Sequence, residues 1–589
     1  MSAVDEAMRA AIEAHQAGRL AEAGSACERV LAQQPRHPDA LHLLGLLAHQ
    51  AGRHGQALAL IGEVLQLAPG HATAHANLGN VLLALGRVSE AIASCRRALA
   101  LQADLAPAHN GLGNALRAAG KLDEAQRCFR RALELQPGFP EAHNNLGLVL
   151  HATGRTEEAL ACLERALALR PAFPEALNNL GLTLEALGRP REALAHLEEA
   201  VRVRPAYAEA HNNLATAYKA LGLYDAALAE YRRALELQPD FPEAHNNLGL
   251  TLEALGRSAE AIECFQRAQA LRPAFAAACL NEGLALLRQG DFAGGWPLYE
   301  WRFEALGARR LVREFAQPLW LGEESIAGRS ILLHYEQGLG DTIQMLRFAP
   351  LLAAQGAQVS VEVPPTLASV ARTLRGGVRV LAEGAPLPET DLQCPLMSLP
   401  LACGTTLASI PQQVPYLHAP APELHAWAER LGARRRPRVG LAWSGSAGYT
   451  STMRERDLPL PLLLSVLGSD AEFHSLQRDY RAGDRERVCA DGRIAEWSGQ
   501  FTDLGATAGL LAQLDLVVSI DTAVAHLAGA MGKPVWLLLP AHADHRWLLE
   551  RNDSPWYPTM RLLRQPAFGD WGSVLARVAA ALASAPWTA

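Results

Sequence analysis

A glycine-rich segment in the second half of the chain brings a carboxylate to the start of a predicted helix. Its sequence is Gly338-Leu339-Gly340-Asp341, and it follows a β-rich run over residues 330–335. Because glycine has no Cβ, a ligand can approach the backbone closely there. Asp341 either faces such a ligand or only caps the helix, and both interpretations stay open at this point.

A second segment of this kind follows an apolar strand predicted over residues 515–520. It reads Asp521-Thr522-Ala523-Val524-Ala525-His526 and begins another predicted helix. The free amides and the positive end of the helix dipole suit a diphosphate, with the Thr522 hydroxyl as a further donor. His526 lies one turn into the helix, on the same side as Thr522. A simple N-capped core helix is the alternative.

Common nucleotide-binding and metal-binding motifs are missing from the sequence. A dinucleotide fingerprint needs a third glycine where this chain has Ile343, and the Walker lysine motif does not occur. The chain also contains no Asp-x-Asp, the motif with which many nucleotide-sugar enzymes hold a divalent metal. We therefore expect no NAD site and no resident metal or other cofactor.

Strands alternate with helical patterns throughout the second half of the chain. The predicted strands cover residues 330–335, 358–363, 378–381, 438–443, 472–476, 515–520 and 534–539. This alternation is typical of parallel, doubly wound α/β domains, which bind ligands at the carboxyl ends of their strands. Prolines between Pro411 and Pro422 interrupt the pattern. They predict two Rossmann-like lobes with a hinge, and a cleft between the lobes.

The first half of the chain repeats every 34 residues. Prolines recur at Pro35, Pro69, Pro137, Pro171, Pro205, Pro239 and Pro273, and a second ladder of glycines runs from Gly52 to Gly290. This period, with small residues in both helices and a glycine at the turn, is the signature of tetratricopeptide repeats (TPRs). Stacked repeats form a superhelix with a long concave groove. We expect eight repeats over residues 4–275 and a capping unit over residues 276–308.

Asparagines recur at two neighbouring positions in the first helix of most repeats. The second position holds Asn77, Asn145, Asn179, Asn213, Asn247 and Asn281. Asparagine is a mediocre helix former, so helix propensity does not explain this ladder. A carboxamide can pair with the peptide groups of an extended chain whatever its side chains are. Asn145, Asn179, Asn213 and Asn247 are therefore candidate contacts for a bound polypeptide, and hydrogen bonding between adjacent repeats is the alternative.

The composition limits the class of protein. The 589 residues carry a net charge of −7, which gives no electrostatic reason to expect a nucleic-acid partner. We expect no membrane span, because no apolar stretch reaches 18 residues. The first 20 residues read as a repeat helix rather than a signal peptide, and nine cysteines are scattered without metal-ligand spacing. These features favour a cytoplasmic location.

Taken together, the motifs of the second half resemble a known family. Gly-Leu-Gly-Asp after the first strand and the run from Asp521 to Pro534 resemble the heptosyltransferase-type GT-B glycosyltransferases. The motif order over the whole chain resembles bacterial TPR-containing glycosyltransferases, of which some modify flagellin. The asparagine ladder resembles that of the TPR half of O-GlcNAc transferases, which binds acceptor polypeptide.

The resemblance implies roles for particular residues. Asp341 matches the family's general base, and the Asp521–Thr522–Ala523 turn matches its diphosphate site. A second phosphate-side loop matches Ser444, Gly445 and Ser446. Where the family has a lysine shortly afterwards, this chain has Arg454 and Arg456, which are candidates for a phosphate clamp. The full donor-binding set that we expect is Gly338, Gly340, Ser444, Gly445, Ser446, Gln477, Asp521, Thr522, Ala523 and His526.

The expected architecture is an α-helical TPR superhelix followed by an α/β GT-B domain with two Rossmann-like lobes. The boundaries that we predict are a TPR array over residues 1–309, a linker over 310–329, an N-terminal lobe over 330–430 and a nucleotide-sugar-binding C-terminal lobe over 431–589. The expected activity is inverting, metal-independent transfer of a sugar from a nucleotide-sugar donor to a protein in the groove, flagellin being one such acceptor. The alternatives are a TPR scaffold with an inactive transferase domain, and a transferase acting on a glycan or lipid-linked saccharide.

Overall fold

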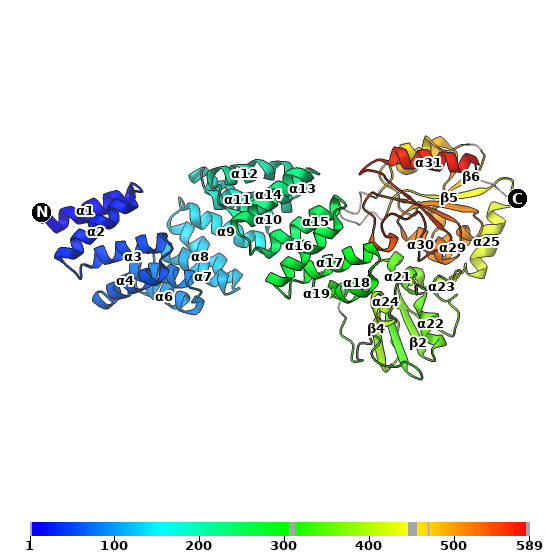
Figure 1. Ribbon diagram of the computed structural model, residues 1–589, viewed down its shortest axis with the longest axis horizontal. Helices are drawn as coiled ribbons and strands as arrows, with labels where there is room; N and C mark the ends of the chain where they lie inside the picture. Colours follow the sequence, from blue (N-terminus) through cyan, green and yellow to red (C-terminus); the bar gives the residue numbers. More distant parts are fainter. Residues whose placement is uncertain (1–2, 306–312, 446–455, 469, 585–589) are drawn as a thin grey trace. The chain divides into compact units, whose positions relative to one another are not determined.

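The computed structural model of the chain describes residues 3–305, 313–445, 456–468 and 470–584. Its contacts divide the chain into two compact units, Met1–Asp240 and Phe241–Ala589. The division falls between two helical repeats, so the second unit contains repeats as well as an α/β domain (Figure 1).

Helices in pairs form all of the first unit and the beginning of the second. The first helices of the pairs are α1 (Ala3–Gln16), α3 (Pro38–Gln50), α5 (Ala72–Ala84), α7 (Ala106–Ala118), α9 (Pro140–Ala152), α11 (Pro174–Ala186), α13 (Ala208–Ala220) and α15 (Pro242–Ala254). The second helices are α2 (Leu20–Gln33), α4 (His54–Leu67), α6 (Val88–Leu101), α8 (Leu122–Leu135), α10 (Thr156–Leu169), α12 (Pro190–Val203), α14 (Tyr224–Leu237) and α16 (Ser258–Leu271). The predicted TPR array is thereby confirmed.

The repeated glycines have two structural causes. The turn glycines, such as Gly154 with φ +77°, take the left-handed conformation that other residues adopt only with strain. The glycines inside the first helices lie against the second helix of the same repeat. A Cβ on Gly147 would lie 2.8 Å from Cγ of Leu163, so only glycine allows this close packing.

A last helical unit follows the eight pairs and packs into the α/β domain. It consists of α17 (Ala276–Gln289), α18 (Phe292–Tyr299) and α19 (Arg302–Ala305). Leu287, Phe292 and Trp296 of this unit belong to the same buried apolar cluster as the strands that follow. The predicted capping unit is therefore a part of the α/β domain's core.

The first lobe is built on a parallel four-stranded sheet of order β3-β2-β1-β4. Its elements are β1 (Ser330–His334), α21 (Leu339–Met345), α22 (Phe348–Ala354), β2 (Gln358–Val363), η1 (Pro365–Leu367), α23 (Ala368–Ala371), β3 (Arg379–Ala382), β4 (Leu392–Pro395), η2 (Leu396–Ser398) and α24 (Leu399–Ala402). The predicted linker joins this sheet, because the backbone N–H of Trp320 donates to the carbonyl of Gln393 in β4.

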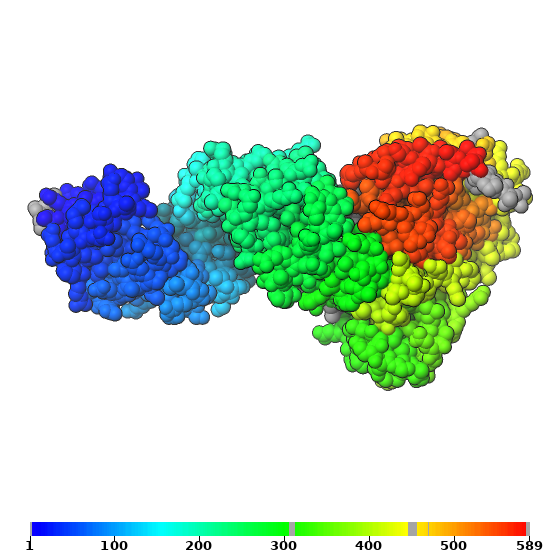
Figure 2. Space-filling view, viewed as in Figure 1, coloured from blue at the N-terminus to red at the C-terminus, as the bar shows by residue number. Residues whose placement is uncertain are grey.

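The second lobe is built on a parallel six-stranded sheet of order β10-β9-β8-β5-β6-β7. Its strands are β5 (Arg438–Ala442), β6 (Glu472–Ser475), β7 (Ile494–Ala495), β8 (Leu516–Ile520), β9 (Val535–Leu539) and β10 (Met560–Arg564). Its helices are α25 (Ala421–Leu431), α27 (Leu460–Leu464), α28 (Asp484–Asp491), η3 (Ser498–Gln500), α29 (Leu504–Ala512), α30 (Ala523–Ala530), η4 (His545–Trp547) and α31 (Trp571–Ser584). The two lobes lie against one another (Figure 2).

Both sheets reverse their strand order at one point, as doubly wound sheets do. In the first sheet the reversal lies at β1 and β4, and in the second it lies at β5 and β8. The carboxyl ends of strands at such a point open a crevice for ligands. The predicted fold class, a TPR array followed by an α/β domain with parallel sheets, is confirmed.

Candidate active site

A pocket of about 610 Å³ lies at the carboxyl ends of these strands. Both lobes line it, and so do Leu280, Leu284, Tyr299 and Arg302 of the last helical unit. The volume falls within the range of small-molecule sites. The predicted residues Gly338, Gly340, Asp341, Ser444, Gly445, Arg456, Gln477, Asp521, Thr522, Ala523 and His526 all line this pocket. Ser446 and Arg454 lie outside the described residues.

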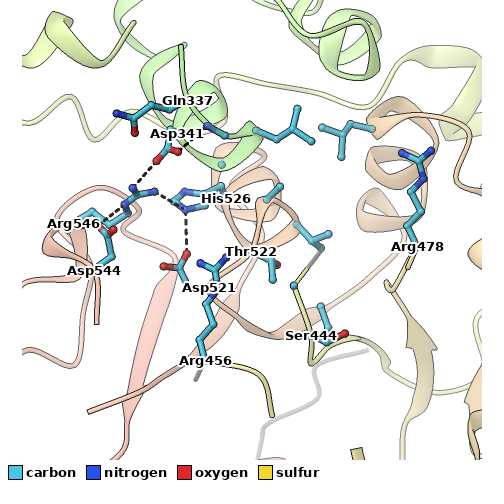
Figure 3. A pocket seen from close by; sticks show the side chains of 18 of the residues that line it. Gln337, Asp341, Ser444, Arg456, Arg478, Asp521, Thr522, His526, Asp544 and Arg546 are labelled. Carbon is cyan, nitrogen blue, oxygen red and sulfur yellow. Dashed lines mark hydrogen bonds and ion pairs between the residues drawn. The ribbon is translucent and has the colours of Figure 1, made fainter. Parts of the chain in front are cut away.

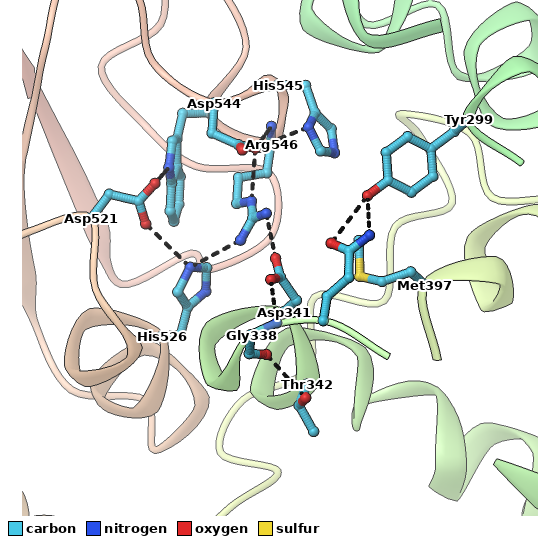
Figure 4. Close-up of polar contacts among 12 residues, drawn as sticks. Tyr299, Gly338, Asp341, Thr342, Met397, Asp521, His526, Asp544, His545 and Arg546 are labelled. Carbon is cyan, nitrogen blue, oxygen red and sulfur yellow. Dashed lines mark hydrogen bonds and ion pairs between the residues drawn. The ribbon is translucent and has the colours of Figure 1, made fainter. Parts of the chain in front are cut away.

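Asp341 stands at the start of α21 and uses both of its carboxylate oxygens within the protein. Oδ2 accepts a hydrogen bond from the backbone N–H of Gly338 at 3.1 Å. Oδ1 pairs with Nη2 of Arg546 at 2.5 Å, across from the first lobe to the second (Figure 4). The carboxylate thus does cap its own helix, but it also faces the pocket in one fixed orientation.

Arg546 links Asp341 to a chain of polar groups in the second lobe. Its Nε donates to Asp544 Oδ1 at 2.8 Å, and its Nη1 lies 3.3 Å from Nε2 of His526. The same imidazole nitrogen lies 3.3 Å from Oδ1 of Asp521. The other oxygen of Asp521 accepts from Nε1 of Trp547 at 2.9 Å. The dashed contacts in Figure 3 follow this chain from Asp341 to Asp521.

The charges of this cluster stabilise one another. Burial alone would raise the pKa of Asp521, but the bond to His526 and the nearby Arg546 hold that pKa below its ordinary value. Burial would lower the pKa of Arg546, whereas Asp544, Asp341 and Asp521 raise it well above its ordinary value. Removing Arg546 would therefore leave the buried Asp521 and the half-buried Asp341 without this counter-charge, which is costly.

The helix α30 begins in the pocket, directly after β8. Thr522 is its N-cap residue, with φ −141° and ψ 165°, and no side chain caps the helix. The Thr522 hydroxyl lies 3.2 Å from Oγ of Ser519. Thr522, Ala523 and Val524 all line the pocket. The first amides of α30 and its positive dipole end are therefore placed as an anion site requires.

The loop after β5 is held by Gln477 at the end of β6. The amide oxygen of Gln477 accepts from the backbone N–H groups of Trp443 and Ser444 at 3.0 and 3.2 Å. Its amide nitrogen donates to Ser444 Oγ at 2.8 Å and to the carbonyl of Asp479 at 3.0 Å. Gln477 is buried and its side chain is used within the protein. It therefore fixes the shape of this end of the pocket.

Two further arginines of the second lobe line the pocket. Arg456 and Arg478 both line the cavity (Figure 3). Arg478 is exposed and makes no hydrogen bond or ion pair with the described part of the chain. The carboxylates Asp341 and Asp544 lie away from Arg478 in the same view, and Arg546 pairs with both of them.

Gly340 allows a close contact between the two lobes, which the sequence did not indicate. A Cβ at this position would lie 2.9 Å from Cδ2 of His526 in the second lobe. The glycine therefore lets α21 approach α30 closely, rather than only leaving room for a ligand. This contact brings the two segments that the sequence singled out, the Gly338 loop and the Asp521 turn, to one site.

The asparagine ladder pairs between adjacent repeats. Nδ2 of Asn179 donates to Oδ1 of Asn144 at 2.9 Å, and Nδ2 of Asn213 donates to Oδ1 of Asn178 at 2.8 Å. Asn145 bonds in the same way to Asn110, and Asn281 to Asn246. These bonds are the hydrogen bonding between adjacent repeats that the sequence analysis gave as the alternative to polypeptide binding. One N–H of each donating amide stays available for a further partner.

Sequence reasoning missed Arg546, Asp544 and Tyr299 as site residues. The signal for the first two was the polar run His542-Ala-Asp-His-Arg-Trp547, which follows the predicted strand over residues 534–539. Polar residues just after a parallel strand lie at the ligand-binding edge of the sheet. Tyr299 carried no local signal, because it belongs to the helical unit and reaches the site only through the tertiary fold.

Three family models match separate parts of the chain. Residues 2–249 match the model described as "Cilia and flagella-associated protein 70 C-terminal domain", and residues 242–275 match "Tetratricopeptide repeat". Residues 498–556 match "Glycosyltransferase family 9 (heptosyltransferase)". The last match contains Asp521, Thr522, His526 and Arg546 of the pocket.

Protein FlbA of Caulobacter vibrioides is 27% identical over 335 residues, which are 50% of this chain and 53% of FlbA. The chain thus spans about half the length of this curated relative. Among solved structures, the APC/C hetero-tetramer Cut9–Hcn1 matches at 22% identity and TM-score 0.43, over 47% of this chain and 54% of that chain. A thermophilic TPR protein of Thermus thermophilus matches at 30% identity and TM-score 0.29, over 31% of this chain and 99% of that chain. At these TM-scores the likeness carries no further argument.

The fold and the matches define the class of protein. It is a TPR protein whose repeats are followed by an α/β domain with parallel sheets. That domain carries a glycosyltransferase family 9 segment, and the resemblance to heptosyltransferase-type enzymes is confirmed by this match. Within the described ranges, no helix has the length and apolar character needed to cross a membrane.

Proposed function

We propose that the protein transfers a sugar from a nucleotide-sugar donor to a polypeptide acceptor, in a two-lobed GT-B arrangement. One observation carries the proposal. A carboxylate of the first lobe, Asp341, and the uncapped start of α30 in the second lobe line the same pocket. A base and an anion site on opposite lobes are what transfer from a nucleoside diphosphate requires.

In the proposed reaction, Asp341 accepts the proton of the acceptor hydroxyl or amide as that group attacks the anomeric carbon. The new glycosidic bond forms while the bond from that carbon to the phosphate oxygen breaks, and the nucleoside diphosphate leaves with the electron pair. Attack from the face opposite the leaving group inverts the anomeric centre. Each oxygen of Asp341 makes one bond within the protein and keeps a lone pair for the incoming proton.

The diphosphate would be held by the start of α30, with the Thr522 hydroxyl and the amides of Ala523 and Val524 as donors. These groups carry partial positive charge where negative charge develops on the leaving group. Ser444, Gly445 and Arg456 at the other end of the pocket would hold the nucleoside side of the donor. With these donors and without an Asp-x-Asp in the sequence, we propose that transfer needs no metal.

The acceptor proposal rests on the helical repeats. Leu280 and Leu284 lie on α17, and both line the pocket. A polypeptide in contact with this helix would therefore reach the pocket itself. The half-buried asparagines Asn145, Asn179, Asn213 and Asn247 would bind an extended segment of the acceptor through their carboxamide groups. Flagellin is the acceptor that we propose to test first, and the cytoplasm is the compartment that we propose.

The test of this function is nucleotide release by the full chain. The protein is incubated with unfolded flagellin and with UDP-N-acetylglucosamine, GDP-mannose, ADP-heptose or dTDP-rhamnose in turn. We expect release from one of these donors, and we expect Asp341→Asn to lower its rate by about a hundredfold or more. Asp470→Asn, at an exposed site on the second lobe, is the matched control and should leave the rate unchanged. Unchanged turnover in Asp341→Asn would remove Asp341 from the mechanism.

A further inference from the structure

The last helical unit contacts the two loops that carry Asp341 and Arg546. The Tyr299 hydroxyl accepts from Nε2 of Gln337 at 2.9 Å and lies 3.3 Å from Oε1 of the same side chain. The Tyr299 ring also packs against the His545 ring, with 5.7 Å between the centroids. Tyr299 is 5% exposed and lines the pocket (Figure 4). It therefore contacts one residue in each loop.

The two residues that Tyr299 contacts are chain neighbours of the Asp341–Arg546 pair. Gln337 precedes Gly338, whose N–H is bonded to the Asp341 carboxylate. His545 precedes Arg546, whose guanidinium is bonded to the same carboxylate. A displacement of either loop would move one partner of the pair relative to the other.

Arg302 of α19 holds the loop that contains Gln337 and Gly338. Its side chain is completely buried, and its Nη2 donates to Ser398 Oγ at 2.7 Å and to Glu336 Oε1 at 3.1 Å. Glu336 is the residue before Gln337, and its Oε1 also accepts from the backbone N–H of Met397. Such a buried, hydrogen-bonded pair allows little movement, because separating it would leave a charge without a partner.

We infer that Tyr299 and Arg302 are positioning residues for Asp341, so that the last helical unit completes the catalytic centre as well as the repeat array. Tyr299 sets the Gln337–Gly338 loop against His545, and Arg302 holds the same loop through Glu336. The inference rests on the proposed function, because it gives Asp341 the role of the base. A displacement of about 1 Å at a reacting group can cost up to about a hundredfold in rate.

The test uses the full chain and the donor of the panel above that is turned over fastest. Tyr299→Phe removes one hydroxyl and leaves the ring in place. We expect kcat to fall about tenfold, with the KM for the donor changed by less than about twofold. Arg302→Lys, which loses the planar guanidinium, should lower kcat further. Tyr231→Phe is the matched control, since Tyr231 is also a buried repeat tyrosine whose hydroxyl is hydrogen-bonded, to Thr216. It should leave kcat unchanged.

A double variant separates positioning from general stability. If Tyr299 acts through Asp341, adding Tyr299→Phe to Asp341→Asn should change the remaining rate by less than about twofold. A further tenfold loss in that background, or a normal kcat in Tyr299→Phe alone, would overturn the inference. If Asp341→Asn itself is fully active, or no donor of the panel is turned over, the proposed function fails and the inference fails with it. A normal kcat in Tyr299→Phe together with a strongly lowered kcat in Asp341→Asn would refute only the positioning role of Tyr299. The proposed function would then stand.

Discussion

Asp341, His526 and Arg546 belong to one hydrogen-bonded chain, although they lie far apart in the sequence. The sequence predicted the first two as site residues because each lies in a distinctive strand-to-helix segment. It missed Arg546, because an ion pair between lobes depends on how the two sheets meet. The sequence thus predicts that Asp341 and His526 belong to the site, whereas the residues to which they are hydrogen-bonded are known only from the tertiary structure.

Donor affinity should depend on the Thr522 hydroxyl. Thr522→Ala removes one proposed bond to a phosphate oxygen, so nucleoside diphosphate binding should weaken by about 1–2 kcal/mol. Calorimetric titration with UDP, GDP, ADP and dTDP, with and without EDTA, measures this change. Thr522→Ser keeps the hydroxyl and should bind nearly as tightly as the unchanged protein. A strict requirement for magnesium or manganese would contradict the metal-free proposal.

Among the elements of the α/β domain, local patterns predicted most strands to within a residue or two. The predicted strand over 358–363 is β2 (Gln358–Val363), and that over 534–539 is β9 (Val535–Leu539). The helix predicted to begin at the Gly338 loop is short, because α21 (Leu339–Met345) is followed by a separate helix, α22 (Phe348–Ala354). Pro350 explains the break, since it lacks the N–H that would bond to Leu346 and its ring would clash there. The strands β4, β7 and β10 were missed, being short and without clear alternation.

The helix α11 contains a largely buried acid, Glu185, whose titration should change the free energy of unfolding with pH. Burial raises the pKa of Glu185 in α11 to about 7, with nearby Lys219 acting in the opposite direction, and Oε1 is buried without a hydrogen-bond partner. The folded chain therefore binds a proton more tightly than the unfolded chain, so this group lowers stability as pH rises from about 4.5 to about 7. Glu185→Gln should gain about 1–3 kcal/mol relative to the unchanged protein over that range.

Urea unfolding at pH 4.5, 6 and 8 measures the gain in Glu185→Gln. The exposed Glu164 of α10 offers a matched control, and Glu164→Gln should show no such pH-dependent difference. A gain that stays the same at all three pH values would mean that Glu185 does not titrate in this range.

The proposed binding of acceptor polypeptide by the asparagine ladder can be tested by changing four of its asparagines together. Asn145, Asn179, Asn213 and Asn247 changed together to alanine should abolish modification of flagellin, while nucleotide release without acceptor should survive. Each bond contributes only about 0.5–1.5 kcal/mol, so single changes should have little effect. Because several of these side chains also join adjacent repeats, the melting temperature is measured alongside.

A control for the ladder removes exposed ion pairs instead. Arg155, Arg189 and Arg257 changed to alanine lose surface pairs with Glu158, Glu192 and Glu260. These pairs contribute little to stability, so this variant should modify the acceptor normally. Normal modification by the asparagine variant as well would mean that the ladder only joins the repeats.

At the scale of the whole molecule, the sequence predicted a repeat array followed by an α/β domain because the two halves have different periods. It could not predict that the last helical unit shares a core with the α/β domain and lines its pocket. Those contacts join residues far apart in the chain, and no local pattern marks them. The second compact unit accordingly begins at Phe241, within the repeats.

The proposed transfer of a sugar to a polypeptide changes the mass of the acceptor. We would measure the intact mass of unfolded flagellin after incubation with the full chain and each donor of the panel in the presence of EDTA. We expect a mass increase equal to one or more transferred sugar residues with one of the donors, absent without the enzyme and about a hundredfold slower with Asp341→Asn. Donor turnover without any mass increase on flagellin, or an equal increase with Asp341→Asn, would contradict it.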